Sequence, residues 1–353
     1  MWVYSQTGML WQWAFGALIG IGILSVFWPV APYFGLSLPS GFCGGHGTAA
    51  AIGQAFNKMG GEDMMTLAMT SATVGILSSV FIGLAIIKWG TKKGYTSYLT
   101  AFEKLPHELR TGLLPADKRY SMGESSTSAI SIDSLAFNMA IIAMVALGGY
   151  GISKGVSYFM PELEMPVFSC AFVFGILMRY FFKKTGALHY TSPRIIGHLS
   201  GAFTDFLVAF GISSIKVSVV LNYIVPLSIL LVSGLLLTLL YVLVVGRWLM
   251  KNDCWLEKAL FTWGWFTGTV AMGIAMLRVA DPEQKSHCME DYALAYLFIA
   301  PVEICLITFA PVAFANGYGL YFGLLALIAG ACIMGYGWIN DRKAKQQLLS
   351  SKA

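Results

Sequence analysis

Long apolar runs separated by short polar connections dominate the sequence. A helix that crosses a bilayer needs about 20 predominantly apolar residues. Runs of this kind predict eight membrane-spanning helices, at residues 8–28, 67–89, 134–157, 166–182, 195–213, 219–247, 291–314 and 318–339. The one sizeable polar connection, residues 90–133, is predicted to be a cytoplasmic loop. The pattern therefore predicts an all-α polytopic membrane protein.

Two further apolar stretches, 36–57 and 258–277, contain too many glycine and polar residues for ordinary spans. Loops rich in Lys and Arg stay in the cytoplasm. If both stretches enter and leave the membrane on one side, 20 of the 23 Lys and Arg residues lie inside. If 258–277 crossed fully, the basic tail after residue 339 would lie outside. We therefore predict two re-entrant segments, the first entering from outside and the second from inside, with both chain ends cytoplasmic.

The composition supports a membrane protein and argues against several other classes. Hydrophobic residues make up 57% of the chain and charged residues 12%, whereas soluble domains carry about 25% charged residues. The basic residues are scattered over short loops, which argues against a nucleic-acid partner. The sequence has no HExxH, Walker or CxxC motif, so we expect no enzyme activity and no cofactor. If the protein transports a solute, the missing ATP-binding motif means that an ion gradient would supply the energy.

The two interrupted stretches resemble each other. His46-Gly47-Thr48-Ala49 aligns with Thr267-Gly268-Thr269-Val270, and both are followed by a short helical stretch and an acidic loop. Paired broken segments in two inverted halves mark the binding site of many secondary transporters. This predicts inverted-topology repeats at 1–89 and 134–314, with 315–353 as an additional helix and basic tail. By symmetry, about three more helices would be expected ahead of Met1.

The breaks themselves offer groups that bind ions. Irregular backbone at membrane depth leaves N–H and C=O groups that need a cavity or a ligand. A helix N-terminus after each break suits a carboxylate, and the Thr48 and Thr269 hydroxyls suit Na⁺. His46 either hydrogen-bonds a substrate or holds its own loop. The competing interpretation is that the glycines only allow close helix packing.

Four further polar residues lie in predicted spans. A carboxylate at the bilayer centre costs roughly 3 kcal/mol on insertion scales, so Asp205 and Glu303 are candidates for ion or proton binding, or else structural carboxylates. Thr70 and Thr73 lie on one face of the helix 67–89. They are candidate ligands, unless their hydroxyls bond back to helix carbonyls.

The stretches GGHGTAAAIG (44–53) and WFTGTVAMGIAMLRVADP (265–282) resemble the sodium/glutamate symporter family. The resemblance implies Na⁺-coupled uptake of glutamate by alternating access, in two inverted halves of five helices, each with a re-entrant loop, assembled as a homodimer in the cytoplasmic membrane. The residues that it singles out are Gly44, Gly45, His46, Gly47, Thr48, Gly268 and Thr269.

The chain departs from that family at Val270-Ala271, where well-known bacterial members carry Thr-Pro. Arg278 lies just beyond, and an Arg fork matches a carboxylate, so we predict that Arg278 binds an anionic substrate. Two alternatives stay open: a carrier for a different carboxylate, and a channel-like or non-transporting membrane protein.

Overall fold

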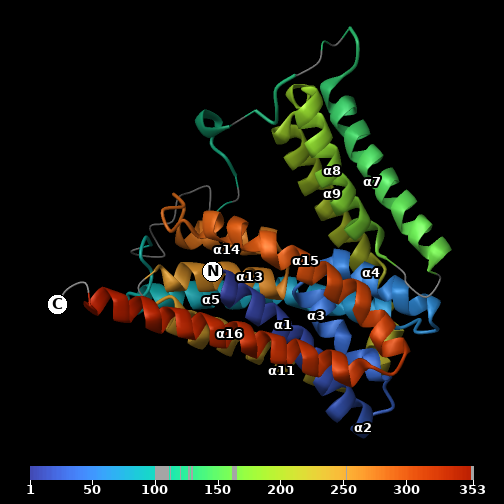
Figure 1. Ribbon diagram of the computed structural model, residues 1–353, viewed down its shortest axis with the longest axis vertical. Helices are drawn as coiled ribbons and strands as arrows, with labels where there is room; N and C mark the ends of the chain where they lie inside the picture. Colours follow the sequence, from blue (N-terminus) through green and yellow to red (C-terminus); the bar gives the residue numbers. More distant parts are fainter. Residues whose placement is uncertain are drawn as a thin grey trace. The chain divides into compact units, whose positions relative to one another are not determined.

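The computed structural model describes residues 1–99, 111, 113–119, 121–125, 128, 130–160, 165–251 and 253–350. Among these residues the only regular secondary structure is helical. The chain forms two compact units, one comprising Met1–Leu109 with Ser214–Ala353 and the other Arg110–Ser213 (Figure 1). Much of the predicted cytoplasmic loop 90–133, including 100–110, lies outside the described residues.

The larger unit holds most of the helices. In chain order they are α1 (Trp2–Ile19), a π-helical turn (Gly20–Leu24), α2 (Ser25–Phe27), a 3₁₀ turn (Pro32–Leu36), α3 (Ser37–Phe42), α4 (Gly45–Lys58), α5 (Met64–Lys92), α10 (Val217–Asn222), α11 (Ile224–Leu240), a second π-helical turn (Tyr241–Val245), α12 (Gly246–Leu249), α13 (Trp255–Thr267), α14 (Val270–Ala280), α15 (Cys288–Ala315) and α16 (Gly319–Ser350). The smaller unit contains a 3₁₀ turn (Ala116–Lys118), α7 (Ser134–Phe159), α8 (Val167–Thr185), another 3₁₀ turn (Ala187–Tyr190) and α9 (Pro193–Ser213).

Seven helices in the described part of the chain are long and apolar enough to cross a membrane: Trp2–Phe27, Met64–Lys92, Ser134–Phe159, Pro193–Ser213, Ile224–Leu249, Cys288–Ala315 and Gly319–Asn340. They coincide with seven of the eight predicted spans. The eighth, 166–182, forms the 19-residue helix α8 but is not among the seven. Arg179, Lys183 and Lys184 fall in its last two turns and reduce the apolar length.

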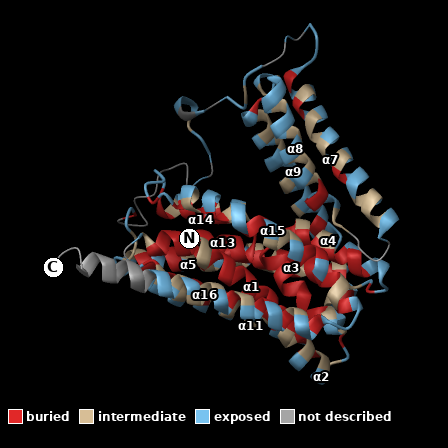
Figure 2. Cartoon of the chain, in the orientation of Figure 1, coloured by how far each residue is buried: buried red, intermediate tan, exposed pale blue. Residues whose placement is uncertain are grey.

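The centre of the larger unit is α13, in which every residue is buried (Figure 2). It packs against α5, α11 and α14. Its 13 residues span about 20 Å, which is less than the roughly 30 Å hydrocarbon core of a bilayer. The predicted second re-entrant segment is thus a short buried helix followed by a break and a second short helix.

Helix α16, predicted as an addition to the repeat, lies along α1 (Figure 1). Three of its glycines are spaced seven residues apart, so they recur on one face. A Cβ atom on each would lie within 3.0 Å of α1: Gly323 against Leu18, Gly330 against Trp11 and Gly337 against Val3. Small residues at this spacing let two membrane helices approach closely.

In the smaller unit, α7 approaches α8 closely at Gly149. A Cβ on Gly149 would lie 2.5 Å from the Ala171 Cα atom. Asn138 Oδ1 accepts a hydrogen bond from the Ser192 N–H at 3.0 Å, which ties α7 to the start of α9. Most side chains of the three helices are exposed (Figure 2), as expected for helices that face lipid or other apolar partners.

The compact units do not follow the predicted repeats, because the larger unit combines residues from both. A repeat is a relation between sequences, whereas a compact unit is defined by packing. The inverted relation between 1–89 and 134–314 therefore stays a prediction.

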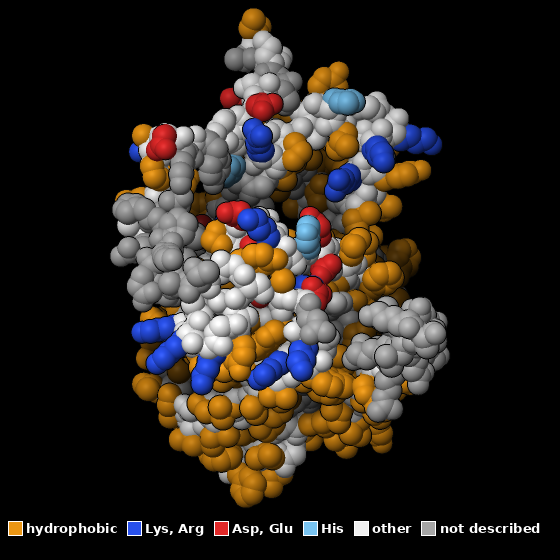
Figure 3. Space-filling view, turned by 90° about the vertical axis from the view of Figure 1, so that its left-hand side faces the viewer, with side chains coloured by type: hydrophobic (Ala, Val, Ile, Leu, Met, Phe, Trp, Pro, Cys, Tyr) orange, Lys and Arg blue, Asp and Glu red, His pale blue; other side chains and the backbone are white. Residues whose placement is uncertain are grey.

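The two ends of α5 differ in charge. Beyond its C-terminus, the Arg247 guanidinium stacks over Tyr95 and Trp255, at 5.0 and 5.9 Å from the ring centroids. Exposed basic side chains gather at this end: Lys88, Lys92, Lys93, Arg247 and Lys251. Figure 3 shows Lys and Arg side chains in a row beside an apolar surface. The 29 residues of α5 extend about 43 Å. Its other end begins six residues after Lys58, the last residue of α4. The predicted sidedness stays a prediction.

Candidate functional site

The second break lies between α13 and α14. Helix α13 ends at Thr267, Gly268 has φ −156° and ψ −95°, and the extended residue Thr269 is the N-cap of α14. Thr269 Oγ1 accepts a hydrogen bond from the Met272 N–H at 3.4 Å. A Cβ on Gly264 would lie 2.6 Å from the Gly273 nitrogen. The two helices therefore fold back on each other as a hairpin with the break at its tip.

The first break lies between α3 and α4. Gly45 begins α4 with φ +61°, a left-handed conformation that glycine adopts without strain. No side chain caps this helix, so the N–H groups of its first turn are available to a ligand. Both helices pack on α5, because a Cβ on Gly41 would lie 2.5 Å from the Ala72 nitrogen and one on Gly53 would lie 2.5 Å from the Met65 Cα.

The two breaks meet. A Cβ atom on Gly45 would lie 2.7 Å from Thr269 Cγ2 and 2.9 Å from the Gly268 carbonyl oxygen. On α5, a Cβ on Gly75 would lie 2.2 Å from the Thr267 carbonyl oxygen. The structure thus brings Gly45, Thr267, Gly268 and Thr269 to one place. The first break comes one turn earlier than the sequence alignment indicates, since the pair Gly44-Gly45 interrupts the chain before Thr48 is reached.

His46 links the first break to α5. Its side chain is 1% exposed, and its Nε2 atom lies 3.2 Å from Thr73 Oγ1. Thr73 Oγ1 itself donates to the Met69 carbonyl oxygen at 2.9 Å. Thr48 is 6% exposed, and its Oγ1 atom lies over Gly44, where a Cβ would come within 2.1 Å of it.

Glu303 also lies near the first break. The carboxyl group is half-buried on α15 and accepts a hydrogen bond from the Tyr296 hydroxyl at 3.1 Å. Its helix, α15, packs against α4, which begins at the first break. On the same helix, the buried Tyr292 hydroxyl has no hydrogen-bond partner in the described part of the chain.

Three other predicted residues have different surroundings. Thr70 Oγ1 donates to the Thr66 carbonyl oxygen at 2.8 Å, which is the back-bonding expected as its alternative. Arg278 is exposed and lies about 13 Å along α14 from Thr269. Asp205 is exposed on α9 in the smaller unit. Their roles in binding stay predictions.

Sequence reasoning did not single out Gly75 or Tyr296. A lone glycine in an apolar helix is common, and only the fold shows what approaches it. Tyr296 lies seven residues before Glu303, two helical turns along α15, so this spacing is the one signal that pairs them.

Among the residues that the structure describes, no group of three His, Cys, Asp or Glu side chains is placed to hold a metal ion. The breaks do offer neutral oxygen atoms, which are the ligands that hard cations prefer. They are the Gly268 carbonyl and the Thr48 and Thr269 hydroxyls.

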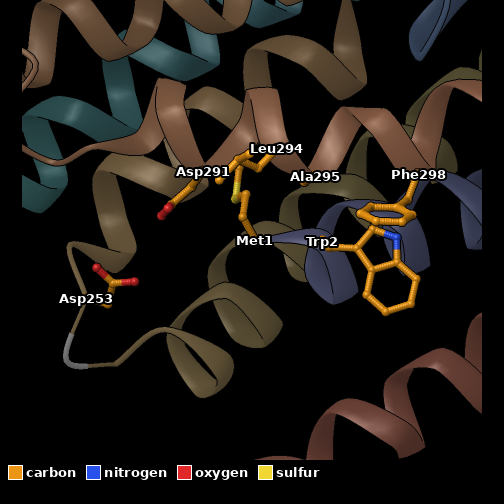
Figure 4. A pocket seen from close by; sticks show the side chains of 7 residues that line it. All are labelled: Met1, Trp2, Asp253, Asp291, Leu294, Ala295 and Phe298. Carbon is orange, nitrogen blue, oxygen red and sulfur yellow. The ribbon is translucent and has the colours of Figure 1, made fainter.

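A buried ion cluster anchors the start of α13. The Lys258 side chain is 2% exposed and its ammonium donates to Asp253 and, at 2.6 Å, to Asp291 on α15. Burial lowers the pKa of Lys258, but the two hydrogen bonds outweigh it and the net pKa is raised. A hollow of about 520 Å³ lies beside the cluster, lined by Met1, Trp2, Asp253, Asp291, Leu294, Ala295 and Phe298 (Figure 4). The cluster fixes the base of the hairpin whose tip forms the second break.

The chain matches the family model described as sodium/glutamate symporter over residues 10–267. This range includes the first break and reaches the end of α13. Comparisons with curated proteins and with solved structures gave no match.

Proposed function

Because the chain belongs to the sodium/glutamate symporter family, we propose that it is a secondary active carrier. It would move L-glutamate, or a related anionic amino acid, together with Na⁺ across the cytoplasmic membrane. The observation that carries the proposal is the meeting of two broken helices, with Gly45 against Gly268 and Thr269. Broken helices that meet inside a transporter commonly form its substrate and ion site.

The substrate carboxylate would bind at the helix N-termini. The N-cap residue of α4 is Gly44, and no side chain bonds the first N–H groups of this helix. In α14, Thr269 caps only the Met272 N–H. The free N–H groups of Gly45, His46 and Val270 are therefore available to an anion, with the partial positive charge of each helix end.

Na⁺ would bind the neutral oxygen atoms of the same breaks, the Gly268 carbonyl with the Thr48 and Thr269 hydroxyls. Bound Na⁺ next to a bound carboxylate would raise the affinity for the anion. By thermodynamic linkage the anion would raise the affinity for Na⁺ by the same factor. This reciprocity couples the two movements.

Alternating access would involve the contact between the two tips. The tips touch through glycine and a threonine methyl group, so little buried apolar surface becomes exposed when they separate. The Lys258 cluster meanwhile holds the base of the second hairpin to α15. We propose a homodimer as the assembly, as the family resemblance implies.

Uptake of labelled glutamate into proteoliposomes, with and without an inward Na⁺ gradient, tests this proposal. A carrier gives saturable accumulation that collapses when Na⁺ is replaced by K⁺. A flux that rises linearly with glutamate concentration would indicate a channel. The proposed function would be contradicted if well-inserted protein took up neither glutamate nor other carboxylates in a Na⁺-dependent way.

A further inference from the structure

The hydrogen bonds around Thr73 fix the proton on His46. A threonine hydroxyl has one hydrogen to donate, and Thr73 gives it to the Met69 carbonyl oxygen at 2.9 Å. With that hydrogen used, we assign the donor of the 3.2 Å hydrogen bond between His46 Nε2 and Thr73 Oγ1 to His46. Nε2 carries the hydrogen, and the ring is held as that tautomer.

The other ring nitrogen is then an unused acceptor. His46 Nδ1 is buried and has no hydrogen-bond partner in the described part of the chain. The side chain is 1% exposed, and no carboxylate forms an ion pair with it there. Because a charged ring buried without a counter-ion is costly, the ring is neutral and Nδ1 presents a bare lone pair. Buried polar atoms in native proteins almost always have a partner.

Resting on the proposed function, we propose that His46 Nδ1 accepts a hydrogen bond from the ammonium group of an amino-acid substrate. A substrate carboxylate has only lone pairs to offer and is repelled. Na⁺ prefers oxygen ligands to an imidazole nitrogen. His46 follows Gly45, which contacts the second break, and its own N–H is among those assigned to the carboxylate, so donors and the acceptor belong to the same break. One end of the substrate would thus meet donors and the other an acceptor.

This division of roles makes His46 a specificity-determining residue. Glutamate satisfies Nδ1, whereas glutarate, which has the same two carboxylates and no amine, leaves it unpaired. A buried acceptor without its partner costs about ten- to hundredfold in affinity. The carrier should therefore select amino acids over dicarboxylates of the same length.

Two substitutions separate the two ring nitrogens. In His46→Asn the amide oxygen reaches the position of Nδ1, so an acceptor is retained there. In His46→Gln the amide nitrogen reaches the position of Nε2, so the bond to Thr73 is retained and the acceptor is lost. Competition of glutamate and glutarate against labelled glutamate uptake measures the preference. We expect at least tenfold preference for glutamate in the wild type, most of it kept in His46→Asn and lost in His46→Gln.

Equal competition by the two compounds in the wild type would overturn the assignment, as would equal effects of the two substitutions. The ¹⁵N chemical shifts of labelled histidine in wild-type membranes give a second measurement that needs no variant to fold. These shifts should show that Nε2 of His46 carries the hydrogen, both in the wild type and in Thr73→Ser. The His46 Nδ1 signal should shift when glutamate is added and should not shift with glutarate. A hydrogen on Nδ1 would overturn the assignment, whether or not uptake is seen. If the tautomer is as expected but no uptake is seen, that result would count against the proposed function alone.

Discussion

Gly45 and Thr269 pack directly against each other, so a Cβ on Gly45 would lie 2.7 Å from the Thr269 methyl carbon. The two residues lie far apart in the sequence, each at a break between two helices. Their contact turns two separate irregular segments into one site.

Gly45→Ala should abolish most uptake. The substitution adds a methyl group against Thr269 and places a Cβ on a residue with φ +61°, a conformation that costs about 1–2 kcal/mol for other residues. Uptake at fixed expression should fall more than tenfold. Gly60→Ala is the matched control, because Gly60 has φ +86° and nothing within 4 Å of its Cβ position. Partial recovery in Gly45→Ala with Thr269→Ser would identify the methyl contact as the cause, and equal losses in the two alanine variants would refute it.

Thr48→Val should weaken the dependence on Na⁺ without preventing insertion. Valine keeps the shape and removes the hydroxyl oxygen assigned to Na⁺. The Na⁺ concentration for half-maximal uptake should rise about tenfold, corresponding to roughly 1.4 kcal/mol. Thr91→Val is the control, because the Thr91 hydroxyl bonds the Ile87 carbonyl at the far end of α5. An unchanged Na⁺ activation curve would exclude Thr48 as a ligand.

Arg278→Gln tests the predicted anion contact. If Arg278 binds the substrate, the apparent affinity should fall while the maximal rate changes little. Lys285→Gln is the comparison, since Lys285 is an exposed basic residue that pairs with Glu283. Equal affinities in the two variants would make Arg278 an ordinary basic residue of the cytoplasmic side.

The Lys258 cluster should respond asymmetrically to substitution. Replacing Asp253 and Asp291 together by asparagine leaves a buried ammonium without a counter-ion, at a cost on the order of 3 kcal/mol. Lys258→Met leaves two partly exposed carboxylates that water can solvate, so it should lower the melting temperature less. The opposite order would contradict the view that the buried charge resides on Lys258.

The same cluster predicts a pH dependence. The pKa of Lys258 is raised above 10.5 in the folded protein. Its contribution to stability is therefore complete below the pKa of an unfolded lysine and is lost as the pH rises through the raised value. Melting curves between pH 8 and pH 12 should fall less steeply in Lys258→Met than in the wild type.

Cysteines introduced at Lys58 and Lys92 test the predicted sidedness. The two residues lie at opposite ends of the helix pair α4 and α5. A membrane-impermeant maleimide added to intact cells should label Lys58→Cys above the level of the unsubstituted protein and leave Lys92→Cys unlabelled until the membrane is opened. The reverse pattern would invert the topology.

The apolar pattern determined the membrane helices, since length and hydropathy are local properties of the chain and the bilayer sets the length required. Helix α8 differs from its prediction because charged residues in its last turns shorten the apolar segment. The motif GGHGT likewise determined where α4 starts, because consecutive glycines without a cap cannot continue a helix at low cost.

Only the tertiary structure decided which of the candidate residues lie together. Thr70 and Thr73 look alike in sequence and both hydroxyls bond a carbonyl of their own helix, yet the Thr73 hydroxyl also meets His46. Gly75 gains its meaning from the Thr267 carbonyl that approaches it. Such contacts join segments far apart in the chain, and they depend on the packing of whole helices rather than on any local pattern. The sequence determined the two breaks, and the packing of the helices decided that they form one site.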